Sequence, residues 1–153
     1  MPRFGAGQTI LVIDDDRDLL PSLVETIHAF SDFTVITADN GVTALERFFE
    51  TRPDCVMVDV RMPGLDGYQL VRMLRGDAQT AAIPLIILTA LAKDQNRFIG
   101  LASGADQYLV KPVRPRALME AIRNALKSSQ EERADRLSEL AESEPPQSDD
   151  AKD

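Results

Sequence analysis

Short apolar, β-branched segments alternate with amphipathic segments over residues 9–127, a pattern that predicts β–α units around a parallel sheet. The predicted strands are Thr9–Asp14, Phe33–Ala38, Cys55–Asp59, Leu85–Thr89 and Gln107–Lys111. A helix is predicted after each strand, namely Asp18–Phe30, Gly41–Thr51, one capped by Asp66 that runs to about Arg75, about Asp94–Ser103, and one from about Pro115. Five such units favour one doubly wound α/β domain.

The apolar pattern fades after residue 127 and resumes weakly at Ala134, Leu137, Leu140 and Ala141. A capping-box pattern at Ser128 or Ser129 predicts a separate short helix, and one continuous helix over 115–143 is the alternative. Pro145 ends any helix. We therefore expect a domain over residues 1–127, a helical extension or linker over 128–144, and a disordered acidic tail over 145–153.

The net charge of -8 is unevenly distributed. Residues 128–153 contain nine acidic and three basic residues, which gives -6, whereas residues 1–127 carry only -2. Neither part supplies the basic surface that nucleic-acid binding requires. The apolar runs are too short to span a membrane, and no signal peptide is recognisable. The single cysteine, Cys55, is predicted to be a small buried residue in a strand and fits the reducing cytoplasm.

Polar side chains follow four of the predicted strands. Asp14 and Asp15, Asp59, Thr89 and Lys111 stand where a strand ends. The carboxyl ends of parallel strands meet at one edge of a sheet, so these groups converge. Clustered carboxylates repel one another unless a cation neutralises them, and an all-oxygen site favours Mg²⁺. A carboxylate beside a metal and an ammonium group can act as a nucleophile in phosphoryl transfer.

Four segments resemble the signature segments of response-regulator receiver domains: Ile10–Asp16 (ILVIDDD), Val58–Gly67 (VDVRMPGLDG), Leu88–Ala90 (LTA) and Gly104–Pro112 (GADQYLVKP). The resemblance covers roughly residues 8–127 in order and with the spacing of that family. It implies a flavodoxin-like sheet of order 2-1-3-4-5 with five helices, to which this chain adds its C-terminal helical extension.

The resemblance also implies roles for individual residues. Asp59 would be the phosphoacceptor. Mg²⁺ would be bound by Asp14, Asp15 and Asp59, together with the backbone carbonyl of Arg61. Asp16 could be a further ligand, but we interpret it as a cap of the first helix.

Three more residues match the positions of the family's switch. Lys111 would pair with the phosphoryl group or, before phosphorylation, with Asp59. Thr89 would hydrogen-bond a phosphoryl oxygen, and Tyr108 would follow Thr89 inward. The bond between Lys111 and Pro112 is expected to be cis.

The function implied is that of a cytoplasmic phosphorelay protein in a two-component system. A sensor histidine kinase or phosphotransfer protein would supply the phosphoryl group, and a downstream protein would read a change in the face formed by residues 94–103, 107–111 and the helix from Pro115. The chain would catalyse only its own phosphorylation and dephosphorylation, with no nucleic-acid or membrane partner. A mixed-charge set on that face would suit a homodimer or be an ordinary solvated surface: Arg97, Asp106, Arg116, Glu120 and Arg123.

Two alternatives are considered. The receiver could belong to a larger hybrid kinase or enzyme-bearing regulator, in which residues 128–144 would form a dimerising linker. A phosphatase or dehalogenase-like hydrolase is disfavoured, because such enzymes typically carry a second aspartate where this chain has Arg61. Arg61 and Leu91 flank the route of attacking water in the family, and neither can orient it as a short amide or acid would. We therefore predict slow loss of the phosphoryl group.

Overall fold

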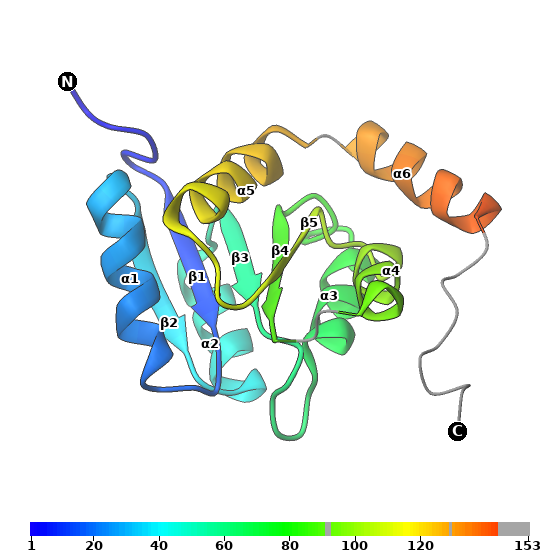
Figure 1. Ribbon diagram of the computed structural model, residues 1–153, viewed down its shortest axis with the longest axis horizontal. Helices are drawn as coiled ribbons and strands as arrows, with labels where there is room; N and C mark the ends of the chain where they lie inside the picture. The colour runs from blue at the N-terminus through cyan, green and yellow to red at the C-terminus, as the bar shows by residue number, and fades with distance from the viewer. Residues whose placement is uncertain (91–92, 129, 144–153) are drawn as a thin grey trace.

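The computed structural model describes residues 1–90, 93–128 and 130–143, and in them a five-stranded parallel sheet is flanked by helices (Figure 1). The strand order is β2-β1-β3-β4-β5, as predicted. The strands are β1 (Thr9–Ile13), β2 (Thr34–Ala38), β3 (Cys55–Val58), β4 (Leu85–Thr89) and β5 (Gln107–Val110). The flavodoxin-like fold is therefore confirmed.

Three strands end one residue earlier than predicted. β1 stops before Asp14, β3 before Asp59 and β5 before Lys111. These polar residues continue one backbone contact beyond the strands, since the amide of Asp59 donates to Ile13 O at 2.9 Å and that of Lys111 to Thr89 O at 2.8 Å. The sheet backbone therefore fixes where each polar side chain starts.

The helices are α1 (Leu19–Phe30), α2 (Gly41–Thr51), α3 (Gly67–Gly76), α4 (Asp94–Ala102), α5 (Pro115–Lys127) and α6 (Gln130–Glu142). Two apolar clusters cover the two faces of the sheet, because successive side chains of a strand point to opposite faces. On β1, Ile10 and Val12 pack with α1 and α5, whereas Leu11 and Ile13 pack with α2 and α3. Cys55 is fully buried in the first cluster, as predicted.

The start of α3 is held close to the end of β3. The Asp66 carboxylate accepts from Gln69 N at 2.8 Å, and the Gln69 side chain accepts from Asp66 N, which completes a capping box. A Cβ atom at Gly67 would stand only 2.5 Å from the carbonyl oxygen of Asp59. Glycine at this position therefore allows α3 to begin directly against the loop that carries Asp59.

The C-terminal extension is a separate helix. α5 ends at Lys127, Ser128 is extended, and α6 begins at Gln130, so the alternative of one continuous helix is wrong. Ser128 Oγ donates back to Asn124 O at 3.3 Å, and Ser129 lies outside the described residues. The predicted tail over 145–153 lies outside them too. No helix among the described residues is long and apolar enough to cross a membrane.

Candidate functional site

Three carboxylates meet at the carboxyl edge of the sheet. Asp14 and Asp15 follow β1, and Asp59 follows the neighbouring strand β3. Each offers a carboxylate oxygen within 4.8 Å of the others. Asp14 and Asp59 are buried and Asp15 is exposed, so the cluster has one side open to solvent.

Lys111 joins two of these carboxylates. Its Nζ donates to Asp14 Oδ2 at 2.6 Å and to Asp59 Oδ2 at 2.8 Å. Burial by itself lowers the pKa of Lys111, but the hydrogen bonds that Lys111 donates to both carboxylates outweigh it and raise this pKa above its ordinary value. Burial raises the pKa of Asp14 despite the hydrogen bond from Lys111. One ammonium group therefore does not fully compensate the charge of the cluster.

Backbone amides orient the two buried carboxylates. Asp14 Oδ1 accepts from Asp16 N at 2.9 Å, and Asp59 Oδ1 accepts from Arg61 N at 3.1 Å. The Asp16 side chain instead accepts from Asp18 N at 3.0 Å and from Leu19 N at 3.1 Å. Its predicted role as a cap of the first helix is confirmed.

The chemistry of the cluster fits Mg²⁺. Three carboxylates and one ammonium leave a formal charge of -2, which one divalent cation would balance. All candidate ligands among the described residues at this edge are oxygens, the donor type that Mg²⁺ prefers, and the open side leaves room for water or phosphate oxygens. Asp14, Asp15 and Asp59 are therefore the residues that could hold the ion.

Thr89 and Tyr108 lie on β4 and β5, the two strands on one side of β3. Thr89 ends β4 and is fully buried, and Tyr108 in β5 is 4% exposed. Burial, together with a hydrogen bond to Tyr68, raises the pKa of Tyr108. Tyr68 Oη in turn donates to Asn96 O in α4 at 3.1 Å. The tyrosine pair therefore fixes the position of α4, and no sequence pattern pointed to Tyr68, because its partners lie far along the chain.

Comparison with known families shows which family the chain belongs to. The family model of the response regulator receiver domain matches residues 10–123. The chain belongs to this family. The receiver match runs from the second residue of β1 through β5, and it includes the predicted metal ligands and Lys111.

The receiver is similar to several curated regulators. It is 37% identical over 131 residues to the DNA-binding response regulator MtrA of Mycobacterium tuberculosis (strain ATCC 25618 / H37Rv), covering 86% of this chain and 56% of the relative. It is 45% identical over 103 residues to the transcriptional regulatory protein PrrA of Mycobacterium leprae (strain TN), covering 67% of this chain and 43% of the relative. The chain thus spans about half the length of these relatives.

Solved structures agree with the fold. A putative response regulator from Chloroflexus aurantiacus J-10-fl superposes with a TM-score of 0.75 at 31% identity, covering 79% of this chain and 98% of the other. The chemotaxis response regulator CheY4 of Vibrio cholerae superposes with a TM-score of 0.71 at 28% identity, covering 77% and 98%.

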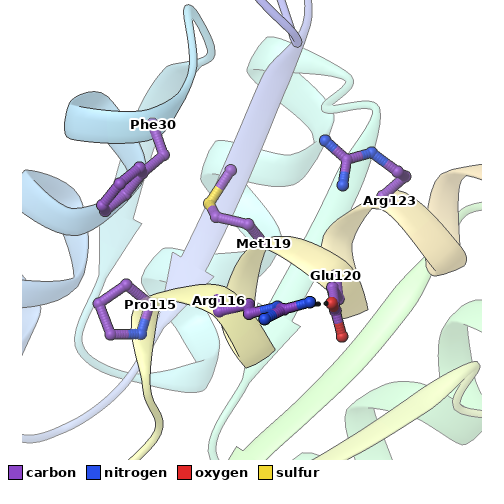
Figure 2. Close-up of a pocket in the computed structure, with 6 residues that line it drawn as sticks. All are labelled: Phe30, Pro115, Arg116, Met119, Glu120 and Arg123. Atoms are coloured by element: carbon purple, nitrogen blue, oxygen red, sulfur yellow. Dashed lines mark hydrogen bonds and ion pairs between the residues drawn. The ribbon is translucent and has the colours of Figure 1, made fainter.

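The residues of the mixed-charge set do not all lie on the face formed by α4, β5 and α5. Arg116, Glu120 and Arg123 of α5 line a groove of about 650 Å³ that also includes Phe30 at the end of α1 (Figure 2). Arg116 Nε lies 3.2 Å from Glu120 Oε1, and the Asp106 side chain is fully buried. Arg116, Glu120 and Arg123 share the side of α5 that faces α1, because they recur at helical spacing, and Asp106 is not a surface residue. The homodimer stays a prediction.

Proposed function

We propose that this receiver accepts a phosphoryl group on Asp59 from a sensor histidine kinase or a phosphotransfer protein, in a Mg²⁺-dependent reaction. The observation that carries the proposal is the position of Lys111 Nζ, 2.8 Å from Asp59 and 2.6 Å from Asp14. An ammonium group at this place can stabilise negative charge on a phosphoryl group attached to Asp59. The same contact orients the nucleophile beforehand.

The reaction needs only one covalent exchange. An oxygen of Asp59 forms a bond to phosphorus while the bond from phosphorus to the donor's imidazole nitrogen breaks, and the imidazole leaves with that electron pair. Mg²⁺ held by Asp14, Asp15 and Asp59, with the carbonyl of Arg61 as a further proposed ligand, would offset charge on the phosphoryl oxygens. Lys111 would shift its contact from the carboxylate to the new phosphoryl group.

The donor has a surface to bind next to the site. A groove of about 430 Å³ lies between α1 and the loop after β5, and Lys111 borders it. Its other lining residues are mostly apolar or small, and include Leu19, Pro112 and Val113. A donor protein that presents an amphipathic helix here would bring its phosphorylated side chain to the open side of the carboxylate cluster.

The output would be a change in the face formed by α4, β5 and α5. Thr89 would hydrogen-bond a phosphoryl oxygen of Asp59, and Tyr108 would respond to that movement. In the present structure Tyr108 is already turned inward and hydrogen-bonded to Tyr68. Phosphorylation would therefore act on a packed contact under α4 and bias its equilibrium between two arrangements.

A wider role follows from the relatives. The matched part of this chain covers 56% of the MtrA regulator and 43% of the PrrA regulator; by their names, the first binds DNA and the second regulates transcription. We propose that the receiver acts in the cytoplasm on a downstream protein, or as the receiver part of a larger regulator. In the second case residues 128–144 would be the connecting helix, with residues 1–127 as the receiver and 145–153 as a tail.

Chemical phosphorylation tests the proposal. The full chain, Asp59→Asn and the matched control Asp16→Asn would be incubated with Mg²⁺ and acetyl phosphate, and the acid-stable, base-labile acyl phosphate quantified. Asp16 is the suitable control because it adjoins the cluster but caps α1, a role asparagine can keep. We expect labelling of the wild type and of Asp16→Asn and none of Asp59→Asn. Labelling that persists in Asp59→Asn, or is absent from all three, would overturn the proposal.

A further inference from the structure

A buried carboxylate at the amino end of β5 binds α6. The Asp106 side chain is 0% exposed, and it accepts two hydrogen bonds from Arg133, with Nε 2.7 Å from Oδ1 and Nη2 3.0 Å from Oδ2. Arg136 Nη1 lies 3.5 Å from Oδ1. Arg75 of α3 completes the set, with Nη2 2.9 Å from Oδ2. Bidentate pairs of this kind fix the orientation of the helix that donates them.

The face of α6 that turns inward is small, and half of its residues are charged. Its buried or half-buried positions recur at helical spacing: Arg133, Arg136, Leu137 and Leu140. α6 is in contact with α4 and lies beside it (Figure 1). Arg136 Nη1 also lies 3.4 Å from the carbonyl oxygens of Ala105 and Asp106, at the corner between α4 and β5. Since only two leucines contribute apolar area, the two arginines hold α6 in place.

α6 can detach without leaving the buried Asp106 carboxylate uncompensated. Asp106 would keep Arg75 and the amide of Leu85, which donates to Oδ2 at 2.9 Å. Arg75 also donates to the carbonyl oxygens of Gly104 and Ile83, so it stays in place by itself. Arg133 and Arg136 would regain water. A helix of 13 residues is marginal on its own, so release and loss of helix would occur together.

The same corner is linked to the phosphorylation site through α4. Tyr108 lies two residues after Asp106 on β5, and its ring packs under α4 so closely that a Cβ at Gly100 would stand 2.6 Å from it. Tyr108 also reaches the start of α4 through Tyr68 and Asn96 O. α4 is thus held by the tyrosine pair on one side and touches α6 on another. A shift of α4 must change the contact with α6.

We infer that α6 is an intramolecular latch, held beside α4 by the contacts of Arg133 and Arg136 with Asp106, and released when Asp59 is phosphorylated. The inference rests on the proposed function, because it takes the phosphoryl group as the trigger. Docked α6 covers the α4 surface that an output partner would use. Release uncovers that surface and frees residues 130–143.

Amide hydrogen exchange of the full chain tests the latch. Exchange in peptides over 130–143 would be followed with Mg²⁺ alone and with Mg²⁺ plus acetyl phosphate, in the wild type, Asp59→Asn and Arg133→Gln. Glu139→Gln is the matched control, because it removes one charge from the exposed face of the same helix. We expect phosphorylation to speed exchange of wild-type α6 by about tenfold or more. Arg133→Gln should exchange fast without the donor, and Glu139→Gln should behave as the wild type.

The outcomes separate the two proposals. If no acyl phosphate forms on Asp59, the proposed function fails, while fast exchange in Arg133→Gln still shows a docked helix. If the acyl phosphate forms and exchange of α6 does not change, the latch is overturned and the proposed function stands. It is overturned too if unphosphorylated wild type and Arg133→Gln exchange equally fast. Protection that disappears on dilution would place α6 on a second copy of the chain, which also contradicts an intramolecular latch.

Reciprocity supplies a second readout. If phosphorylation favours the released state of α6, a variant in which α6 is already loosened should favour the phosphorylated form of Asp59. Arg133→Gln should therefore reach a given level of acyl phosphate at about threefold lower acetyl phosphate than wild type, whereas Glu139→Gln should not. Equal labelling of Arg133→Gln and wild type would contradict the coupling.

Discussion

The two ends of the sheet carry opposite charge imbalances. At the carboxyl end, three carboxylates share one ammonium, Lys111, and one side is open to solvent. At the amino end, one buried carboxylate, Asp106, faces three guanidinium groups. β5 joins them, with Asp106 just before it and Lys111 just after it. The first arrangement lacks positive charge and can take up a cation and a phosphoryl group. The second arrangement has more guanidinium groups than the carboxylate needs, so α6 can detach and Asp106 keeps Arg75.

The largest expected effect is at the amino end. Asp106→Asn leaves Arg75 buried without a counter-charge and removes the anchor of α6, and we expect the free energy of unfolding to fall by about 3–5 kcal/mol in urea titration. Asp135→Asn, on the exposed side of α6, should change it by less than about 0.5 kcal/mol. Equal effects of the two would show that the buried cluster is not a structural anchor.

Metal binding should stabilise only through the carboxyl end. At a Mg²⁺ concentration about 100 times the dissociation constant, the wild type should gain roughly 2.7 kcal/mol of unfolding free energy. Asp15→Asn should lose most of this gain and Asp16→Asn should keep it, because Asp15 is a member of the carboxylate cluster and Asp16 is not. Thermal unfolding with and without Mg²⁺ measures the difference. An undiminished gain in Asp15→Asn would place the ion elsewhere.

The lifetime of the phosphoryl group tests the role of Arg61, two residues after Asp59. Wild type should lose the acyl phosphate over many minutes or longer, and Arg61→Asn should shorten its half-life about tenfold, roughly 1.4 kcal/mol of barrier, because an amide can orient attacking water. Arg61→Lys should retain the long lifetime. A wild-type half-life of seconds would contradict the prediction. Leu91, the other residue on which it rests, lies outside the described residues.

The excess negative charge itself can be tested in metal-free buffer. Asp14→Asn removes the one of three neighbouring carboxylates whose pKa is raised by burial, so we expect it to stabilise the protein by about 1 kcal/mol at neutral pH. The change is opposite in sign to that of Asp106→Asn. Urea titration in EDTA measures it. Destabilisation by Asp14→Asn would mean that Lys111 compensates this end more completely than its contacts indicate.

The smallest effect concerns Tyr108, between the two ends. Burial raises its pKa in the folded protein above that of the unfolded chain. Its contribution is therefore complete below about pH 10 and is lost as the pH rises, since the unfolded state releases its proton first. Wild type should lose about 0.8 kcal/mol more than Tyr108→Phe between roughly pH 8 and pH 10.5. Equal losses would show that Tyr108 ionises in the fold as easily as in water.

The order of elements and most of the site could be predicted from the sequence. Alternation of apolar runs located the strands within one residue, and each polar residue predicted at a strand end lies there. These signals are local. A buried parallel strand needs consecutive apolar residues, and the polar residues of the site follow directly where each apolar run ends. The roles of Asp14, Asp15, Asp59, Thr89, Tyr108 and Lys111 in phosphoryl transfer stay predictions.

The sequence by itself determined the carboxyl end of the sheet, where parallel strands bring their final residues together whatever the helices do. At the amino end of the sheet, the partners of Asp106 became known only from the tertiary structure. From the sequence, Asp106 was interpreted as one of several surface charges. Its partners Arg75 and Arg133 stand 31 and 27 positions away, on helices whose orientation the sequence does not give. Which face of α6 turns inward depends on how the chain leaves α5 over two residues. A short connection of this kind carries no periodic signal, so the pairing of a buried charge across it becomes visible only once the helices are in place.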